Sequence, residues 1–193
     1  MSQLKKLALA SLVATSAAAH AGGSLDLSIA NEMARVGYDA TKVGSGMHVS
    51  ADFLHHTDDG NIGSVGLHVV DVRNEDPDLY IGVGGKLYGF SADEADEDGD
   101  DASGAAIGLG GFFRYRLPGV PEVSVAGYAY YAPSVISFAD ADNLFDSDVR
   151  IQYSLIPTAR VYAGYRYTGI KIEDVSDRVE LGDGLHVGLK LDF

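Results

Sequence analysis

Apolar and polar residues alternate with a period of two along most of this chain. In the stretch GLHVGLKLDF, which ends at Phe193, Leu185 and Val187 fall on one face of an extended segment, and His186 and Gly188 fall on the other. Strand side chains point alternately to opposite sides, so the stretch predicts a strand with one apolar and one polar face. The alternation recurs in nine blocks, at 24–38, 46–55, 62–73, 79–90, 104–117, 122–135, 148–156, 159–172 and 185–193. Such a series predicts an all-β, antiparallel sandwich or barrel.

Alternation does not tell whether the apolar faces meet lipid or a lumen, because a soluble lipocalin-like barrel and a membrane barrel share the pattern. The connections favour the membrane. If Phe193 ends at the periplasmic rim, the segments 91–103, 139–147 and 173–184 are external, and 118–121 and 157–158 are periplasmic. The external segments are long and acidic and the periplasmic turns are short, as in outer-membrane barrels. A soluble periplasmic binding barrel remains the alternative.

The pattern leaves two strand numbers open. Single-chain bacterial barrels have an even number of strands, and nine blocks are odd. The apolar phase slips within 24–38, from Leu25 and Leu27 to Val36, so this block is a bent strand, a non-spanning segment, or a hairpin broken near Asn31. We therefore predict an up-and-down transmembrane β-barrel, with eight strands favoured by the chain length and ten as the alternative.

The beginning of the chain has the anatomy of a secretory signal peptide. Lys5 and Lys6 precede an apolar run at 7–14, and small residues lead to Ala21. We expect cleavage after Ala21, so that 1–21 is the signal peptide and 22–193 is the barrel. The apolar run is shorter than the roughly 20 residues that a membrane-spanning helix needs.

Charge and composition narrow the partners. The whole chain has a net charge of −14, and removal of 1–21, which holds two lysines and no acid, makes it −16. A protein this acidic is not expected to bind nucleic acid. The chain has no cysteine, so neither disulfides nor thiol chemistry is available.

Six stretches of the sequence resemble the YfaZ family of outer-membrane proteins, and the similarity runs over essentially all of 22–193. They are GGSLDLSIANEMAR, DFLHHTDDGNIGSVGLHVV, IGVGGKLYGF, IGLGGFFRYRLPG, YYAPSVISFADAD and DGLHVGLKLDF. The resemblance implies a small β-barrel in the outer membrane of a Gram-negative bacterium. We expect a monomer in contact with lipid and lipopolysaccharide. The ending is similar to the C-terminal signal that the barrel assembly machinery reads, matched here by His186, Gly188, Leu191 and Phe193.

The polar faces carry a set of charged residues that we expect to line the lumen. They are Lys86, Arg114, Arg116, Arg150, Arg160 and Arg166 together with Asp52 and Asp71. In an eight-stranded barrel these side chains would fill the interior as a paired polar core. In a ten-stranded barrel a narrow, porin-like pore that favours anions becomes feasible. The expected function is therefore structural or that of a narrow solute channel, without catalysis and without a cofactor.

The histidines are the candidates for a catalytic role. His48, Ser50 and Asp52 supply the residue types of a catalytic triad, but same-face neighbours on a strand are about 6.7 Å apart, too far to form a hydrogen-bonded chain. Cross-strand partners could still complete a site around His48 or His68. An outer-membrane hydrolase acting on lipid or peptide is therefore the alternative function.

Two further features have structural explanations. Gly82, Gly84, Gly108 and Gly110 fall on the lumen face, where glycine makes room in a narrow barrel, and they lack the G-x-G-x-x-G spacing of a phosphate loop. Aromatic residues near strand ends suit girdles at the membrane interfaces; they are Phe113, Tyr115, Tyr130, Tyr131, Tyr153, Tyr165 and Tyr167.

An acidic segment, SADEADEDGDDAS, is the candidate for a metal site. Glu94, Asp96 and Asp98 imitate the start of an EF-hand loop, but the twelfth position is Ala105 and not glutamate. We expect a solvated acidic loop. Loose binding of divalent cations shared with lipopolysaccharide phosphates is the weaker alternative.

Overall fold

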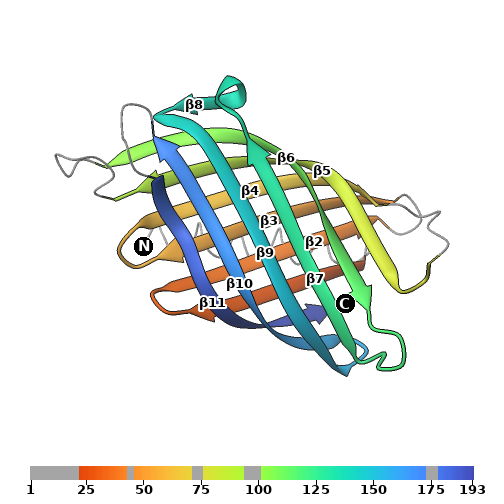
Figure 1. The fold of residues 1–193 in the computed structure, drawn as a ribbon. Helices are drawn as coiled ribbons and strands as arrows, with labels where there is room; N and C mark the ends of the chain where they lie inside the picture. Colours follow the sequence, from red (N-terminus) through yellow and green to blue (C-terminus); the bar gives the residue numbers. More distant parts are fainter. Residues whose placement is uncertain (1–21, 43–45, 71–75, 94–100, 173–177) are drawn as a thin grey trace, which may run out of the picture.

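The computed structural model describes residues 22–42, 46–70, 76–93, 101–172 and 178–193, which form a closed β-barrel (Figure 1). The expected signal peptide 1–21 lies outside the described residues. So do Asp71 and the metal candidates Glu94, Asp96 and Asp98.

Ten strands follow one another around the barrel in chain order. They are β1 (Gly22–Ala30), β2 (Met33–Lys42), β3 (Met47–His56), β4 (Gly60–Val70), β5 (Leu79–Ala92), β6 (Ala102–Arg116), β7 (Val123–Ala132), β9 (Ala141–Ile156), β10 (Ala159–Ile172) and β11 (Arg178–Asp192). All neighbours pair antiparallel, β1 pairs with β11, and the β5–β6 pairing completes the ring. Closure satisfies the backbone polar groups of every spanning strand, which lipid could not do.

The preference for eight strands is wrong, and the alternative of ten is confirmed. The block 24–38 is a hairpin of β1 and β2, with Leu27 opposite Val36 and Ile29 opposite Ala34. Its connection is only Asn31 and Glu32. The register places odd-numbered apolar residues of β1 opposite even-numbered ones of β2, which accounts for the slip in apolar phase.

The outer face of the barrel is apolar and the inner face is polar. Val65, Val83 and Ile151 are 57%, 63% and 63% exposed, whereas Asp26, Asp148 and Arg166 are 6%, 4% and 1% exposed. This arrangement is that of a membrane barrel, so the soluble lipocalin-like alternative, which needs apolar residues inside, is wrong. Within the described residues, no helix is long and apolar enough to cross a membrane.

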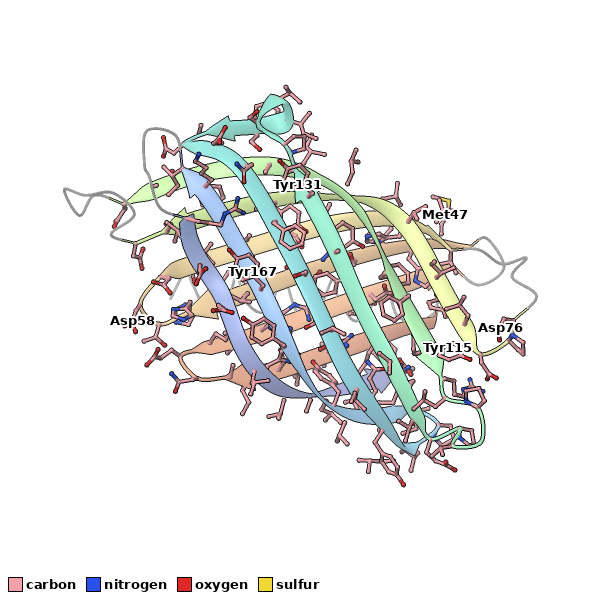
Figure 2. All side chains as sticks on the ribbon, in the orientation of Figure 1. Met47, Asp58, Asp76, Tyr115, Tyr131 and Tyr167 are labelled. Carbon is pink, nitrogen blue, oxygen red and sulfur yellow. The ribbon has the colours of Figure 1, made fainter. Side chains whose placement is uncertain are left out.

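The barrel has two rims, and one of them is marked by the two ends of the described chain. We call the rim with Gly23 and Phe193 the terminal rim; there the Gly23 N–H donates to the Phe193 carbonyl at 2.8 Å, and the Phe193 N–H donates back at 2.9 Å. We call the other the loop rim. Met47 and Asp76 lie toward the terminal rim in Figure 2, and Asp58 lies at the opposite end.

Some strands extend further toward the loop rim than the sequence indicated. Residues 141–147 belong to β9 and 178–184 belong to β11, although both were expected in external loops. A short strand, β8 (Ser137–Ala139), follows the 3₁₀ turn η1 (Ser134–Ile136) and pairs with β6 at 104–106. This part of β6 extends beyond its pairing with β7 at 109–116, so β8 covers an edge that β7 leaves open (Figure 1).

Glycines on the lumen face leave space for aromatic rings. A Cβ atom at Gly82 would lie 2.6 Å from the Phe112 ring, and one at Gly108 would lie 2.8 Å from the Tyr88 ring. These distances are too short for any other residue without movement of the ring. The two glycines therefore serve the packing of the interior.

Candidate functional site

The interior of the barrel changes character along its axis. In the half nearer the loop rim, inward side chains form an apolar cluster that includes Leu54, Leu144, Ile170 and Leu181, the last three with no exposed surface. These residues come from β3, β9, β10 and β11, so the cluster joins strands from different sides of the barrel. It fills this end of the lumen with side chains.

A layer of charged side chains lies next to the apolar cluster. We call it the charge belt; it consists of Asp26, Arg35, Asp52, Lys86, Asp146, Asp148, Arg150 and Arg166. On one side of the barrel, Asp52 accepts from Arg35 and from Lys86, the latter at 3.3 Å. The Lys86 Nζ also lies 3.8 Å from Asp146 and 4.7 Å from the ring centres of Tyr128 and Tyr130.

Asp148 is the centre of the other side of the charge belt. Its side chain has no exposed surface and lies 3.3 Å from Arg166, 3.7 Å from Arg150 and 2.8 Å from His186. Arg150 continues the network to Asp26 at 2.9 Å. Buried charges are tolerated only when they are paired with opposite charges. Ion pairs between its acidic and basic side chains therefore stabilise the charge belt.

Polar uncharged groups complete the charge belt. Asp146 accepts hydrogen bonds from the hydroxyls of Tyr88 and Thr168, both at 2.9 Å, and Asp26 accepts one from Tyr162. The space between the belt and the apolar cluster is only about 20 Å³. That volume is on the order of one water molecule.

A cavity of about 450 Å³ lies between the charge belt and the terminal rim. We call it the vestibule. It reaches from Arg35 and Lys86 of the belt to Gly22 and Phe193 at the rim. The vestibule is thus far larger than the cavity between the charge belt and the apolar cluster.

One wall of the vestibule is aromatic and the opposite wall is charged. Rings from β3 to β7 form the aromatic wall, with centroids 5.5 Å apart for His68 and Phe112, 5.8 Å for Tyr80 and Phe112, and 5.7 Å for His68 and Tyr130. Across the ring of strands, β1, β9, β10 and β11 provide the charged wall, which consists of Asp26, Arg150, Arg160, Lys190 and Asp192.

His48 lies in the aromatic wall with both ring nitrogens engaged. Its Nδ1 is 3.0 Å from Asp39 and its Nε2 is 2.5 Å from the Tyr80 hydroxyl. The Ser50 hydroxyl has no hydrogen-bond partner among the described residues. Asp39, His48 and Ser50 thus meet near one rim, but serine is not hydrogen-bonded to the imidazole as a nucleophile in a triad must be.

The structure distributes the expected lumen residues over three places. Lys86, Arg150, Arg166 and Asp52 are in the charge belt, and Arg114 and Arg160 line the vestibule. Arg116 lies at the terminal rim instead; its side chain is 49% exposed and is 3.6 Å from Asp78. It does not line the vestibule.

The residues of the expected assembly signal also lie in different surroundings. His186 is buried beside Asp148, and Gly188 lies against the Tyr162 ring. Leu191 is 37% exposed, and Phe193 is 56% exposed at the seam with Gly23. Among the ranges that the structure covers, no cluster of three or more histidine or acidic side chains could hold a metal ion.

Several residues of the site escaped the sequence analysis. Arg35 lies in the segment with the phase slip, and Asp146 was assigned to a loop, so the expected lumen set lacked both. Tyr130, expected at a membrane interface, is 2% exposed and points into the lumen. Phe112 and Tyr80 could have been found from the alternation. Tyr80 falls on the same face of its strand as Gly82, and Phe112 falls on the same face as Gly108, and both glycines were expected to face the lumen.

Known proteins resemble the chain in sequence and fold. The protein-family model described as "YfaZ precursor" matches residues 1–193. The outer membrane protein YfaZ of Escherichia coli (strain K12) is 24% identical over 192 residues, covering 98% of this chain and 100% of that protein.

Solved structures extend the likeness to the fold. The outer membrane protease OmpT from Escherichia coli superposes with a TM-score of 0.55 at 11% identity, covering 90% of this chain and 93% of that one. The NanC porin gives a TM-score of 0.44 at 11% identity, covering 90% and 98%. The apolar exterior, the closed ten-stranded ring and the full-length family match agree, and the chain belongs to the YfaZ family of outer-membrane β-barrel proteins.

Proposed function

We propose that the protein is a non-catalytic barrel with a structural role and a lumen that is closed in this structure. The observation that carries the proposal is the charge belt backed by the apolar cluster, with about 20 Å³ of space between them. Passage of a solute would require separation of buried ion pairs such as Arg150–Asp26 at 2.9 Å. Removal of one partner from a buried pair typically costs about 3–5 kcal/mol, so spontaneous opening is disfavoured.

The second candidate is a narrow solute channel. The vestibule supports it, because a cavity of about 450 Å³ already occupies the terminal half of the lumen. In this case the charge belt and the apolar cluster would be the gate. The rearrangement would have to exchange ion pairs rather than break them.

We propose that the terminal rim faces the periplasm. The turn at 157–158 and the connection at 117–122 lie at this rim, whereas the end of β5 at Ala92, the start of β6 at Ala102 and the segment 133–140 lie at the loop rim. Short periplasmic turns and longer external loops are typical of outer-membrane barrels. The junction of β4 and β5 is an exception, since β4 ends at Val70 and β5 begins at Leu79 on the terminal rim, with more residues between them than at 157–158.

Conductance in planar bilayers tests the closed lumen. We expect the purified wild-type protein to give no steady current in 1 M KCl, after a shift in gel mobility on boiling has shown that it is folded. Discrete small openings would favour the channel, and a large permanent conductance would exclude a closed barrel. The variant Arg116→Gln serves as a control, because its side chain lies outside the lumen.

The absence of catalysis needs a test of its own, because Asp39, His48 and Tyr80 are close together. The engagement of both His48 nitrogens and the position of Ser50 support a structural role for this group. We expect the folded protein not to hydrolyse short-chain nitrophenyl esters above the level of a His48→Ala variant. Hydrolysis that disappears in this variant would overturn the proposal.

The expected partners follow from the membrane location. We propose that a monomer contacts lipid and lipopolysaccharide, that the barrel assembly machinery inserts it through an ending with His186, Gly188, Leu191 and Phe193, and that nucleic acid is not a partner. The exposed apolar side chains of the outer face support the contact with lipid. The proposal also includes divalent cations that bind loosely near the acidic segment.

A further inference from the structure

We propose that the vestibule is a binding site for a small organic anion with a flat aromatic ring, such as an aromatic carboxylate. The ring would lie against the aromatic wall, and the carboxylate would meet the basic side chains Lys190 and Arg114. The site goes beyond the proposed structural role, and it does not depend on whether the barrel conducts or on which side of the membrane the terminal rim faces.

The charge of the vestibule supports an anionic ligand. Its lining holds six Lys or Arg side chains and four Asp side chains, a net charge of +2 with neutral histidines, in a chain with a net charge of −14. Oppositely charged surroundings raise the local concentration of a small ion. An acidic protein thus has a basic interior at one end.

Two of the basic side chains lie outside the ion pairs of the lining, although Lys190 is opposite Asp26 in the register of β1 and β11. Neither Arg114 nor Lys190 makes an ion pair within 4 Å among the described residues, although both line the vestibule. The Arg114 guanidinium lies 5.5 Å from the centre of the Tyr80 ring. The other basic residues of the lining are paired, since Arg160 binds Asp192 and Arg150 binds Asp26. Lys190 and Arg114 are therefore available to a ligand.

The aromatic wall supports a flat ligand. Tyr80 and Phe112 are partly exposed, and they belong to a group of rings whose centroids are 5.5–6.2 Å apart. Aromatic rings prefer edge-to-face or offset contacts at such separations, which adds to the area that they bury. A ligand ring would extend this group into the cavity.

Two buried polar atoms of the lining also lack partners. Ser50 is 9% exposed and His68 is 3% exposed, and neither the Ser50 Oγ nor the His68 Nδ1 has a hydrogen-bond partner among the described residues. The two side chains are neighbours, because a Cβ atom at Gly66 would lie 2.6 Å from the Ser50 Oγ and 2.5 Å from the His68 Cε1. Buried groups without partners are costly, so a polar group of a ligand would be stabilised there.

The size of the vestibule agrees with this class of ligand. About 450 Å³ lies within the range of roughly 300–1,000 Å³ that small-molecule sites occupy. The walls come from β-strands paired on both sides, so little ordering is needed on binding.

Titration calorimetry of the folded protein in a zwitterionic detergent tests the proposal, with benzoate as the probe. We expect benzoate to bind, and cyclohexanecarboxylate, which lacks the flat ring, and benzamide, which lacks the charge, to bind at least severalfold more weakly. This comparison uses only the wild-type protein. Absence of binding at millimolar benzoate, or equal binding of the three compounds, would overturn the proposal.

Variants locate the site. We expect Lys190→Gln and Arg114→Gln each to weaken benzoate binding about tenfold or more, the usual effect of a lost charged hydrogen bond. Arg116→Gln removes the same charge two residues from Arg114 but outside the vestibule, and it should bind benzoate like the wild type. Affinity that is unchanged in both vestibule variants, with folding verified by the mobility shift, would place the ligand elsewhere and contradict the proposal. If neither of these variants folds, Phe112→Leu, which should selectively lose benzoate, decides the question.

Discussion

Asp148 shows what a single residue contributes to the lumen. It has no exposed side-chain surface, and its carboxylate lies within 4 Å of Arg150, Arg166 and His186. The two guanidinium groups repel one another unless a negative charge lies between them. Asp148 therefore holds three strands together, because its partners come from β9, β10 and β11.

Replacement of Asp148 by alanine should destabilise the barrel strongly. We expect a loss of about 3–5 kcal/mol in the free energy of unfolding, because Arg166 would stay buried without a counter-charge. Urea titration of the folded protein in detergent measures this loss. The exposed Asp58 is the matched control, and its change to alanine should stay within about 0.5 kcal/mol. Equal urea midpoints for the two variants would show that the charge belt does not stabilise the barrel.

The partners of such a residue could not be predicted from the sequence. The strand phase was enough to place Lys86 and Arg166 on the polar side, as the structure also has them. It does not tell which acid faces which base, since Asp26 and Arg150 are 124 positions apart and meet across the barrel. That information depends on the number of strands and their register, which are properties of the closed ring.

At the scale of elements, the β1–β2 hairpin has the least obvious turn. Glu32 has a φ of 60°, a backbone conformation that is unfavourable for residues other than glycine. Period-two alternation was sufficient to locate the strands, but the sequence around Asn31 has no glycine to mark the turn. The strand count therefore failed at this hairpin, whereas the equally short turn at 157–158 is marked by Pro157.

Glycine at position 32 should stabilise the hairpin. We expect Glu32→Gly to raise the free energy of unfolding by up to about 1 kcal/mol, because the left-handed conformation no longer strains a side chain. The urea midpoint measures the gain. Glu32→Ala removes the carboxylate but keeps the Cβ atom, and it should bring no such gain. If alanine stabilised as much as glycine, the charge and not the backbone would be the cause.

The whole molecule depends on the seam between β1 and β11. This pairing joins residues that are far apart in the chain, and its last bonds join Gly23 and Phe193. A barrel that fails to close here would expose two strand edges to lipid. The seam and the ending that the assembly machinery is expected to read are therefore the same strand.

Phe193→Ala separates these two roles. The backbone bonds to Gly23 do not involve the ring, so we expect the variant to refold in detergent nearly as well as the wild type. In cells we expect severalfold less of the heat-modifiable form in the outer membrane, because the terminal ring is missing from the assembly signal. Phe193→Tyr keeps an aromatic ending and should assemble normally. Normal assembly of Phe193→Ala would exclude the ring as part of the signal.

The Gly23–Phe193 contact also makes the barrel a candidate for circular permutation. Because the two residues are hydrogen-bonded neighbours on adjacent strands, a short linker could join them at the terminal rim without crossing the lumen. New chain ends at 117–122, on the same rim, would leave each of the ten strand pairs unchanged. In a closed ring no strand is geometrically the first. The chain ends can therefore be moved to another connection, which would test whether export needs the original last strand when folding does not.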